Sequence, residues 1–211
     1  MIDAIIFDLD GTLWNATLPA YKALRFVEDK YGAQATDYDT FCSLMGKPMD
    51  EIAANTMEGL PLEKKKSIFK EFYSLELALI RKEGSILYPH MVDTLKKLKD
   101  HYPLFIVSNC QEGYIETFLE THNLGELFKD YISWGERNKP KGENILYIMK
   151  KNSIKSPVYV GDTRGDELAA DHAGIHYYHV DFGFGQALKP YKTISNFKQL
   201  EEEFLPDLTE K

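Results

Sequence analysis

Short apolar runs recur along the chain, and each ends in a cluster of polar or turn-forming residues. They cover residues 4–7, 104–107, 158–160 and 176–180, with a weaker run at 131–134. Runs of this length that end in turn residues are typical of strands buried on both faces, as in a parallel sheet. The pattern therefore predicts strands of a parallel sheet at these positions.

Helical patterns separate the apolar runs. Apolar residues recur at helical spacing in residues 91–98, 114–122, 144–151 and 165–172. Strands that alternate with helices imply right-handed crossovers, and hence an α/β fold with a parallel sheet. In open sheets of this type ligands bind beyond the carboxyl ends of the strands, which is where the polar clusters of this chain fall.

The segment after the first predicted strand breaks this alternation, because it contains long helical patterns and no convincing strand. Turn signals separate its helical patterns, which cover residues 21–31, 48–57 and 63–82. We therefore predict an all-α second domain at residues 15–84, inserted after the first strand. The α/β core would consist of residues 1–14 and 85–211.

Composition and charge narrow the classes of function. The chain has 211 residues, of which 44% are hydrophobic and 27% charged, close to the averages of globular proteins. Its formal net charge of −8 makes it a poor candidate for binding nucleic acid or an anionic membrane. Two cysteines, Cys42 and Cys110, cannot by themselves build a disulfide framework or a structural zinc site. Residues 1–7 lack the basic start of a signal peptide, so we expect a cytoplasmic protein.

Candidate chemistry begins with two carboxylates at the end of the first predicted strand, Asp8 and Asp10, followed by Gly11 and Thr12. Side chains two residues apart in a strand point to the same side. Two like charges at close range are costly unless a cation lies between them, and Mg²⁺ prefers oxygen ligands of this kind together with substrate phosphate. The same residues also form ordinary turns, so the motif alone is compatible with a turn that closes a strand.

Two more polar segments follow predicted strands. Asp162 and Asp166 could complete a cation site, although Asp166 could equally serve the dipole of the following helix. Ser108 and Asn109 suit the binding of a phosphate oxygen, and also suit a helix cap. Each segment alone therefore leaves a structural and a functional interpretation open.

Two lysines, Lys139 and Lys141, precede a predicted helix. Together with the segments above, they give the order acids, hydroxyl, lysine, acids along the chain. The set resembles the haloacid dehalogenase-like hydrolase superfamily, in its phosphoglycolate-phosphatase-like branch, from Asp8 to the glycine-rich loop near Gly185. The resemblance implies a Rossmann-like α/β core with a smaller all-α cap inserted after the first strand. It also implies a Mg²⁺-dependent phosphatase for a small phosphorylated metabolite, such as 2-phosphoglycolate.

The resemblance implies a role for each residue that matches a family motif. Asp8 would be the nucleophile that becomes an aspartyl phosphate. Asp10 would protonate the leaving alcohol and then activate water. Thr12 would help to hold Asp10 in place within the phosphate-binding site. Ser108, with the backbone of Asn109, would bind the phosphoryl group.

The resemblance implies the metal ligands in the same way. Asp8 and Asp162 would bind Mg²⁺ through their carboxylates, and Asp10 through its main-chain carbonyl. Asp166 would bind the ion or orient its water. The ion would allow an anionic nucleophile to meet an anionic phosphate.

The lysine that neutralises the phosphoryl oxygens is left open by the resemblance. Relatives that carry Lys-Pro-x-Pro would select Lys139, whereas those with Lys-Gly directly before the helix would select Lys141. We favour Lys141, because it opens the helical pattern and so places its ammonium group at the rim of the predicted site.

Two alternatives of different kinds are compatible with the same motifs. One is a phosphomutase of the β-phosphoglucomutase type, but such relatives usually carry a histidine in the hinge and cap region. No histidine lies between Asp10 and His90. The other is a catalytically silent binding module, which would normally lack Asp8 or Asp10. We expect a small-molecule phosphate ester as the partner, and the sequence leaves the oligomeric state unknown.

Overall fold

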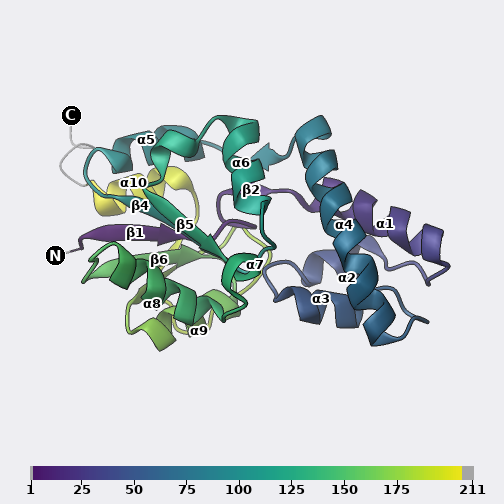
Figure 1. Cartoon of the computed structure of the whole chain (residues 1–211). Coiled ribbons are helices and arrows are strands. Elements are labelled where there is room, and N and C mark those ends of the chain that lie inside the picture. Colours follow the sequence, from purple (N-terminus) through teal and green to yellow (C-terminus); the bar gives the residue numbers. More distant parts are fainter. Residues whose placement is uncertain (1, 206–211) are drawn as a thin grey trace.

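The computed structural model of the chain describes residues 2–205, which form an α/β core and a helical cap (Figure 1). One six-stranded parallel sheet forms the centre of the core, in the order β5-β4-β1-β6-β7-β8. β1 therefore lies in the middle of the sheet, between β4 and β6. The strands are β1 Ala4–Phe7, β4 Leu104–Ser108, β5 Asp130–Ser133, β6 Pro157–Gly161, β7 His176–Val180 and β8 Lys192–Ile194.

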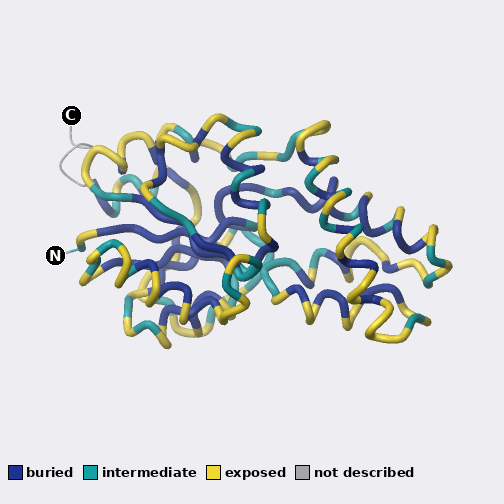
Figure 2. The backbone as a smooth tube through the Cα atoms, in the orientation of Figure 1, coloured by how far each residue is buried: buried dark blue, intermediate teal, exposed yellow. Residues whose placement is uncertain are grey.

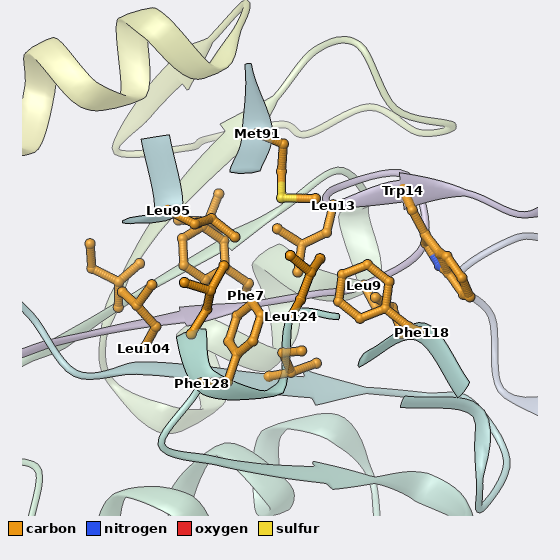
Figure 3. Packing of buried hydrophobic residues seen from close by; sticks show 14 of the residues in the cluster. Phe7, Leu9, Leu13, Trp14, Met91, Leu95, Leu104, Phe118, Leu124 and Phe128 are labelled. Carbon is orange, nitrogen blue, oxygen red and sulfur yellow. The ribbon is translucent and has the colours of Figure 1, made fainter. Parts of the chain in front are cut away.

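Helices cover both faces of the sheet, and the alternation of side chains along β1 divides the core into two layers. Ile5 and Phe7 pack with α5, α6 and α10 on one face, where Figure 3 shows Phe7 near Leu95 and Phe128. Ala4 and Ile6 pack with α8 and α9 on the other face. The helical elements of the core are α5 Met91–Lys99, α6 Tyr114–His122, η1 Gly125–Leu127, α7 Trp134–Arg137, α8 Lys141–Lys151, α9 Arg164–Ala173 and α10 Phe197–Phe204.

The cap has a hydrophobic cluster of its own, formed by its four helices. Figure 1 shows it beyond the end of the sheet to which the strand arrows point, and Figure 2 shows the buried sides of its helices turned toward one another. The cap helices are α1 Thr17–Tyr31, α2 Tyr38–Ser43, α3 Met49–Asn55 and α4 Leu62–Glu83. The predicted fold class, a parallel-sheet core with an all-α cap after the first strand, is confirmed. The limits of the two domains stay a prediction.

Several short elements were absent from the sequence-based prediction. The chain enters and leaves the cap through β2 Trp14–Asn15 and β3 Ile86–Leu87, which pair antiparallel. Two residues are too few to show a strand pattern. β8 at the sheet edge escaped detection because two of its three residues are polar and exposed. No helix within residues 2–205 combines the length and the apolar character that a membrane span requires.

Candidate active site

The middle strands of the sheet bring the predicted motifs to one edge. β1 lies between β4 and β6, so the segments that leave these strands lie side by side at the edge facing the cap. Asp8 directly follows β1, Ser108 ends β4 and Asp162 directly follows β6. Lys141 reaches the same place from the first residue of α8.

Three carboxylates form a buried cluster at this edge. One oxygen each of Asp8, Asp162 and Asp166 lies within 4.8 Å of the other two. Within residues 2–205, no group donates a hydrogen bond to Asp8 Oδ2 or to Asp162 Oδ1, although both atoms are buried. Unpartnered buried acceptors and crowded like charges are both costly, and a hard divalent cation relieves both costs. The donor set therefore fits Mg²⁺.

The pKa values of these carboxyls show the same excess of negative charge. Burial and the neighbouring Asp166 raise the pKa of Asp8 to about 7, although the Lys141 ammonium lowers it. Burial, followed by Asp166 and Asp8, also raises the pKa of Asp162 well above its ordinary value. The one ammonium group thus leaves the carboxylates incompletely neutralised, and a second positive charge would favour their ionised forms.

The two candidate lysines lie in different surroundings. Lys141 is buried, and its Nζ lies 2.8 Å from Asp8 Oδ1 and 2.5 Å from Asp166 Oδ1. Burial alone would lower the pKa of Lys141, but Asp166 and Asp8 raise it above its ordinary value, so this residue stays an ammonium. Lys139 has 52% of its side chain exposed, and its Nζ lies 3.9 Å from Glu143. The structure therefore brings Lys141 to the carboxylates and leaves Lys139 at the surface.

Asp10 lies outside the three-carboxylate cluster and is held by two aromatic donors. Trp14 Nε1 and Tyr114 Oη each donate a hydrogen bond of 2.9 Å to Asp10 Oδ1. Burial raises the pKa of Asp10 to about 6, and these two hydrogen bonds oppose the rise. The Thr12 hydroxyl, expected to hold Asp10, makes no hydrogen bond within residues 2–205. The support of Asp10 thus comes from Trp14 and Tyr114.

The remaining acids are fixed by the segments around them. Asp166 forms a capping box with Thr163 at the start of α9, so the helix-cap role and a place in the carboxylate cluster coexist. The backbone N–H of Phe184 donates to Asp162 Oδ2 at 2.6 Å. A Cβ atom on Gly183 would lie 2.3 Å from the Cβ of Asp162, so no side chain fits there. The loop after β7 therefore closes tightly over Asp162.

Ser108 and Asn109 connect the site to the cap. Ser108 is buried at the end of β4. Asn109 Nδ2 donates a hydrogen bond of 3.0 Å to the main-chain carbonyl of Gly46 in the cap. The segment predicted to bind phosphate thus lies directly below a cap loop.

Known proteins share both the sequence pattern and this fold. Residues 5–180 match the family model of the haloacid dehalogenase-like hydrolases. The chain belongs to the haloacid dehalogenase-like hydrolase family. A family model that spans this range includes all the segments that meet at the sheet edge, from Asp8 to Asp166.

Relatives of this hydrolase carry related names. Phosphoglycolate phosphatase 1 of Pseudomonas aeruginosa is 26% identical over 216 residues, which cover 93% of this chain and 77% of that protein. A phosphoglycolate phosphatase of Aliivibrio fischeri is 26% identical over 203 residues, covering 87% of this chain and 86% of that protein. A haloacid dehalogenase-like hydrolase from Streptococcus pneumoniae has the same fold, with a TM-score of 0.86 at 22% identity, covering 96% and 98% of the two chains.

The cap of this hydrolase contributes a buried carboxyl group that the sequence analysis missed. Glu76 on α4 is 5% exposed, and its Oε2 accepts a hydrogen bond of 2.6 Å from Gln111 Nε2 in the core. The sequence does indicate that Glu76 is buried, because it follows Phe69 and Phe72 and precedes Ile80 at helical spacing. An acidic residue on the apolar face of a helix indicates either a buried hydrogen-bond partner for the carboxyl group or a binding site.

The stability of the protein should reveal the unusual titration of Glu76. Burial raises the pKa of Glu76 from 4.5 to about 8, although the hydrogen bond from Gln111 opposes the rise. The folded state holds this proton more tightly than the unfolded state does. The resulting stabilisation is complete below the unfolded pKa of 4.5 and is lost as the pH rises through about 8.

We therefore expect wild type to lose a few kcal/mol of unfolding free energy relative to Glu76→Gln between about pH 5 and about pH 9. Urea unfolding of both proteins at several pH values measures this difference. Taking the difference removes the titration of the other carboxyls, since both proteins share them. A difference that stays constant with pH would contradict the raised pKa.

Proposed function

We propose that this hydrolase is a Mg²⁺-dependent phosphatase that hydrolyses a small phosphate monoester through an aspartyl phosphate on Asp8. The observation that carries the proposal is the buried pairing of Asp8 Oδ1 with Lys141, which leaves Asp8 Oδ2 without a hydrogen-bond donor within residues 2–205. Lys141 thereby fixes the orientation of this carboxylate, which has two oxygens to share between the cation and the phosphorus atom. Relatives named phosphoglycolate phosphatases support the same reaction class.

The cation would be held by the clustered carboxylates of Asp8, Asp162 and Asp166. The family resemblance adds the main-chain carbonyl of Asp10 to this set. When bound, Mg²⁺ supplies positive charge that lets an anionic nucleophile approach an anionic phosphoryl group. Asp162 is pre-positioned for this task by the backbone N–H of Phe184, which occupies its Oδ2 and leaves Oδ1 unpartnered within the described residues.

The chain's own residues can then divide the reaction into two steps. In the first step a carboxylate oxygen of Asp8 bonds to phosphorus, the bond from phosphorus to the ester oxygen breaks, and Asp10 gives that oxygen a proton. In the second step Asp10 takes a proton from a water molecule whose oxygen attacks the aspartyl phosphate, which releases phosphate and restores Asp8. Lys141 and Ser108 stabilise the charge on the phosphoryl oxygens during both steps.

A pKa of about 6 suits Asp10 to this double task. A general acid-base group works best when its pKa lies near the working pH, because it must both give and take a proton. The hydrogen bonds from Trp14 and Tyr114 occupy Oδ1, so Oδ2 is the oxygen left to exchange the proton. Both donors therefore act as positioning residues for the acid-base group.

Phosphate release tests the proposal directly. We expect the protein to release phosphate from p-nitrophenyl phosphate and from small alkyl phosphates, including 2-phosphoglycolate, when Mg²⁺ is present. Chelation by EDTA should lower the rate by about 10²-fold or more, and added Mg²⁺ should restore it. Circular dichroism in EDTA serves as the control for unfolding. A folded protein that releases phosphate equally well in EDTA would contradict the metal requirement, and one inactive on all esters would contradict the phosphatase.

A further inference from the structure

A small cavity lies between the cap and the core, next to Asp10. It measures about 30 Å³, whereas the open groove on the other side of the site measures about 1190 Å³. The core side of the cavity includes Asp10, Ser108 and Asn109, and the groove includes Lys141 and Asn109 but not Asp10. The two linings share Met45, Gly46, Lys47 and Asn109, so the two spaces adjoin, but only the cavity is lined by Asp10.

The chemistry of the proposed reaction places the leaving alcohol in the small cavity. Asp10 must come within hydrogen-bond reach of the ester oxygen in order to protonate it. Because Asp10 lines the cavity and not the groove, the rest of the alcohol extends into the cavity from that oxygen. The small volume favours an alcohol with few non-hydrogen atoms beyond the ester oxygen.

The cavity wall on the cap side is mostly apolar. Its apolar side chains are Phe41, Met45, Met49, Ile52 and Phe72. Glu76 is the buried acid among them, and Gln111 donates to its Oε2. Within residues 2–205, no group donates a hydrogen bond to Glu76 Oε1. The cavity lining thus includes one carboxyl oxygen of a buried residue with spare accepting capacity.

The ammonium group of the described cavity lining already has an acidic partner. The cationic residue of the lining is Lys47, and its Nζ lies 2.7 Å from Glu51 with 41% of the side chain exposed. Lys141 is committed to Asp8 and Asp166 on the phosphoryl side. A carboxylate inside the cavity would therefore lie among the carboxyl groups of Asp10 and Glu76 with no free ammonium beside it, which is unfavourable in a buried site.

We infer that the substrate is the phosphate monoester of a compact alcohol that carries an amino or hydroxyl group and no carboxylate, and that Glu76 selects it by accepting a hydrogen bond from that group. This inference rests on the proposed phosphatase function and narrows its substrate class. The shared chemistry is a hydrogen-bond donor placed about two carbons from the ester oxygen. An ammonium donor would gain more than a hydroxyl, because charge-assisted hydrogen bonds are stronger.

Three esters of similar size test the inference: 2-aminoethyl phosphate, 2-hydroxyethyl phosphate and 2-phosphoglycolate. They differ in the group that reaches Glu76, which is an ammonium, a hydroxyl or a carboxylate. We expect wild type to favour the first or the second over 2-phosphoglycolate by at least about tenfold in kcat/KM. The order of the first two identifies whether the donor is an amine or a hydroxyl.

The variant Glu76→Gln keeps the size of the side chain and its hydrogen bond from Gln111. It cannot ionise, whereas a bound ammonium group would lower the raised pKa of Glu76 and favour its carboxylate form. With 2-phosphoglycolate as the reference ester, we expect the variant to lower the relative specificity constant for the ammonium ester by about 10- to 100-fold, and that for the hydroxyl ester by about 2- to 10-fold. Glu63→Gln makes the same chemical change on the same helix, at a side chain that is 86% exposed. This control should leave all the ratios at their wild-type values.

Two results would overturn the inference: a wild-type preference for 2-phosphoglycolate, or ratios that Glu76→Gln leaves unchanged. Activity on p-nitrophenyl phosphate separates these results from failure of the proposed function. If that ester and the other three all remain intact, the phosphatase proposal is wrong. In that case, calorimetry measures the affinity of the Mg²⁺-loaded protein for each of the three esters. Tighter binding of 2-phosphoglycolate than of the other two would contradict selection by Glu76.

Discussion

The variant Asp8→Asn should lower the rate of phosphate release by about 10⁴-fold or more, the largest effect that we expect from any single substitution. The amide is close to the carboxylate in size, but it is a poor nucleophile and has no charge to place beside a cation. Lys141 donates to Asp8 Oδ1 at 2.8 Å, and the amide oxygen of the variant can still accept this bond. The loss should therefore come from chemistry and not from collapse of the site.

Asp171→Asn is a matched control for this substitution. Asp171 is exposed near the end of α9, outside the carboxylate cluster, so its conversion should leave the rate within about twofold of wild type. Circular dichroism and urea unfolding show whether both variants fold. Residual activity of Asp8→Asn above about 1% of wild type would contradict covalent catalysis by Asp8.

A chemical trap distinguishes a nucleophile from a residue that only binds the metal. Replacing Asp10 with asparagine should slow hydrolysis of the aspartyl phosphate, because the variant lacks the base that activates water. Mass spectrometry of Asp10→Asn quenched in acid should find a phosphoryl group on the peptide that contains Asp8. The double variant Asp8→Asn/Asp10→Asn should lack it, and an adduct on another peptide would identify a different nucleophile.

The parts of the fold that could be predicted from sequence are those with strong local patterns. Each buried central strand is a nearly uninterrupted apolar run, and α6 was predicted at its observed limits, Tyr114–His122. The prediction failed for elements whose stability comes from partners elsewhere in the chain. The strand pair β2 and β3 is an example, because its two halves are about seventy residues apart and contain two residues each.

In the candidate site too, residues in local motifs could be predicted, whereas residues brought in by distant contacts could not. Asp8, Asp162 and Asp166 belong to motifs that are visible locally in the sequence, and the topology then brings their oxygens within 4.8 Å. Tyr114 could not be found in this way, since its contact with Asp10 spans 104 positions of the chain. Glu76 was detectable as an acid on an apolar helix face, but only the fold shows that this face meets the cavity beside Asp10.

The second large effect on the reaction rate should come from replacing one of the two candidate lysines. Lys141→Met should reduce kcat by about 10²- to 10³-fold, because it removes a positive charge aimed at the place where phosphoryl charge develops. Lys139→Met should stay within about twofold of wild type, since its side chain is half exposed and its ammonium lies 3.9 Å from Glu143. Parallel kcat and KM measurements on p-nitrophenyl phosphate make the comparison.

Loss of Lys141 also leaves Asp8 and Asp166 without their buried partner, which can cost about 3–5 kcal/mol of unfolding free energy. Kinetics are therefore measured with excess Mg²⁺, and Lys141→Arg serves as a variant that keeps the charge. Arginine should retain more activity than methionine if charge is what matters. If Lys141→Met and Lys141→Arg both kept near-wild-type rates while Lys139→Met were slow, Lys139 would be the residue that stabilises the phosphoryl charge.

The position of Lys141 is itself an argument for function. It is the first residue of α8 and follows the N-cap Pro140, where the helix dipole disfavours a positive charge. The two carboxylates in front of it compensate for this placement and for its burial. A chain selected for stability alone would gain by moving the charge away from this position. A lysine at this unfavourable position is best explained by a substrate that needs its positive charge. The kinetic difference between Lys141→Met and Lys139→Met measures that need.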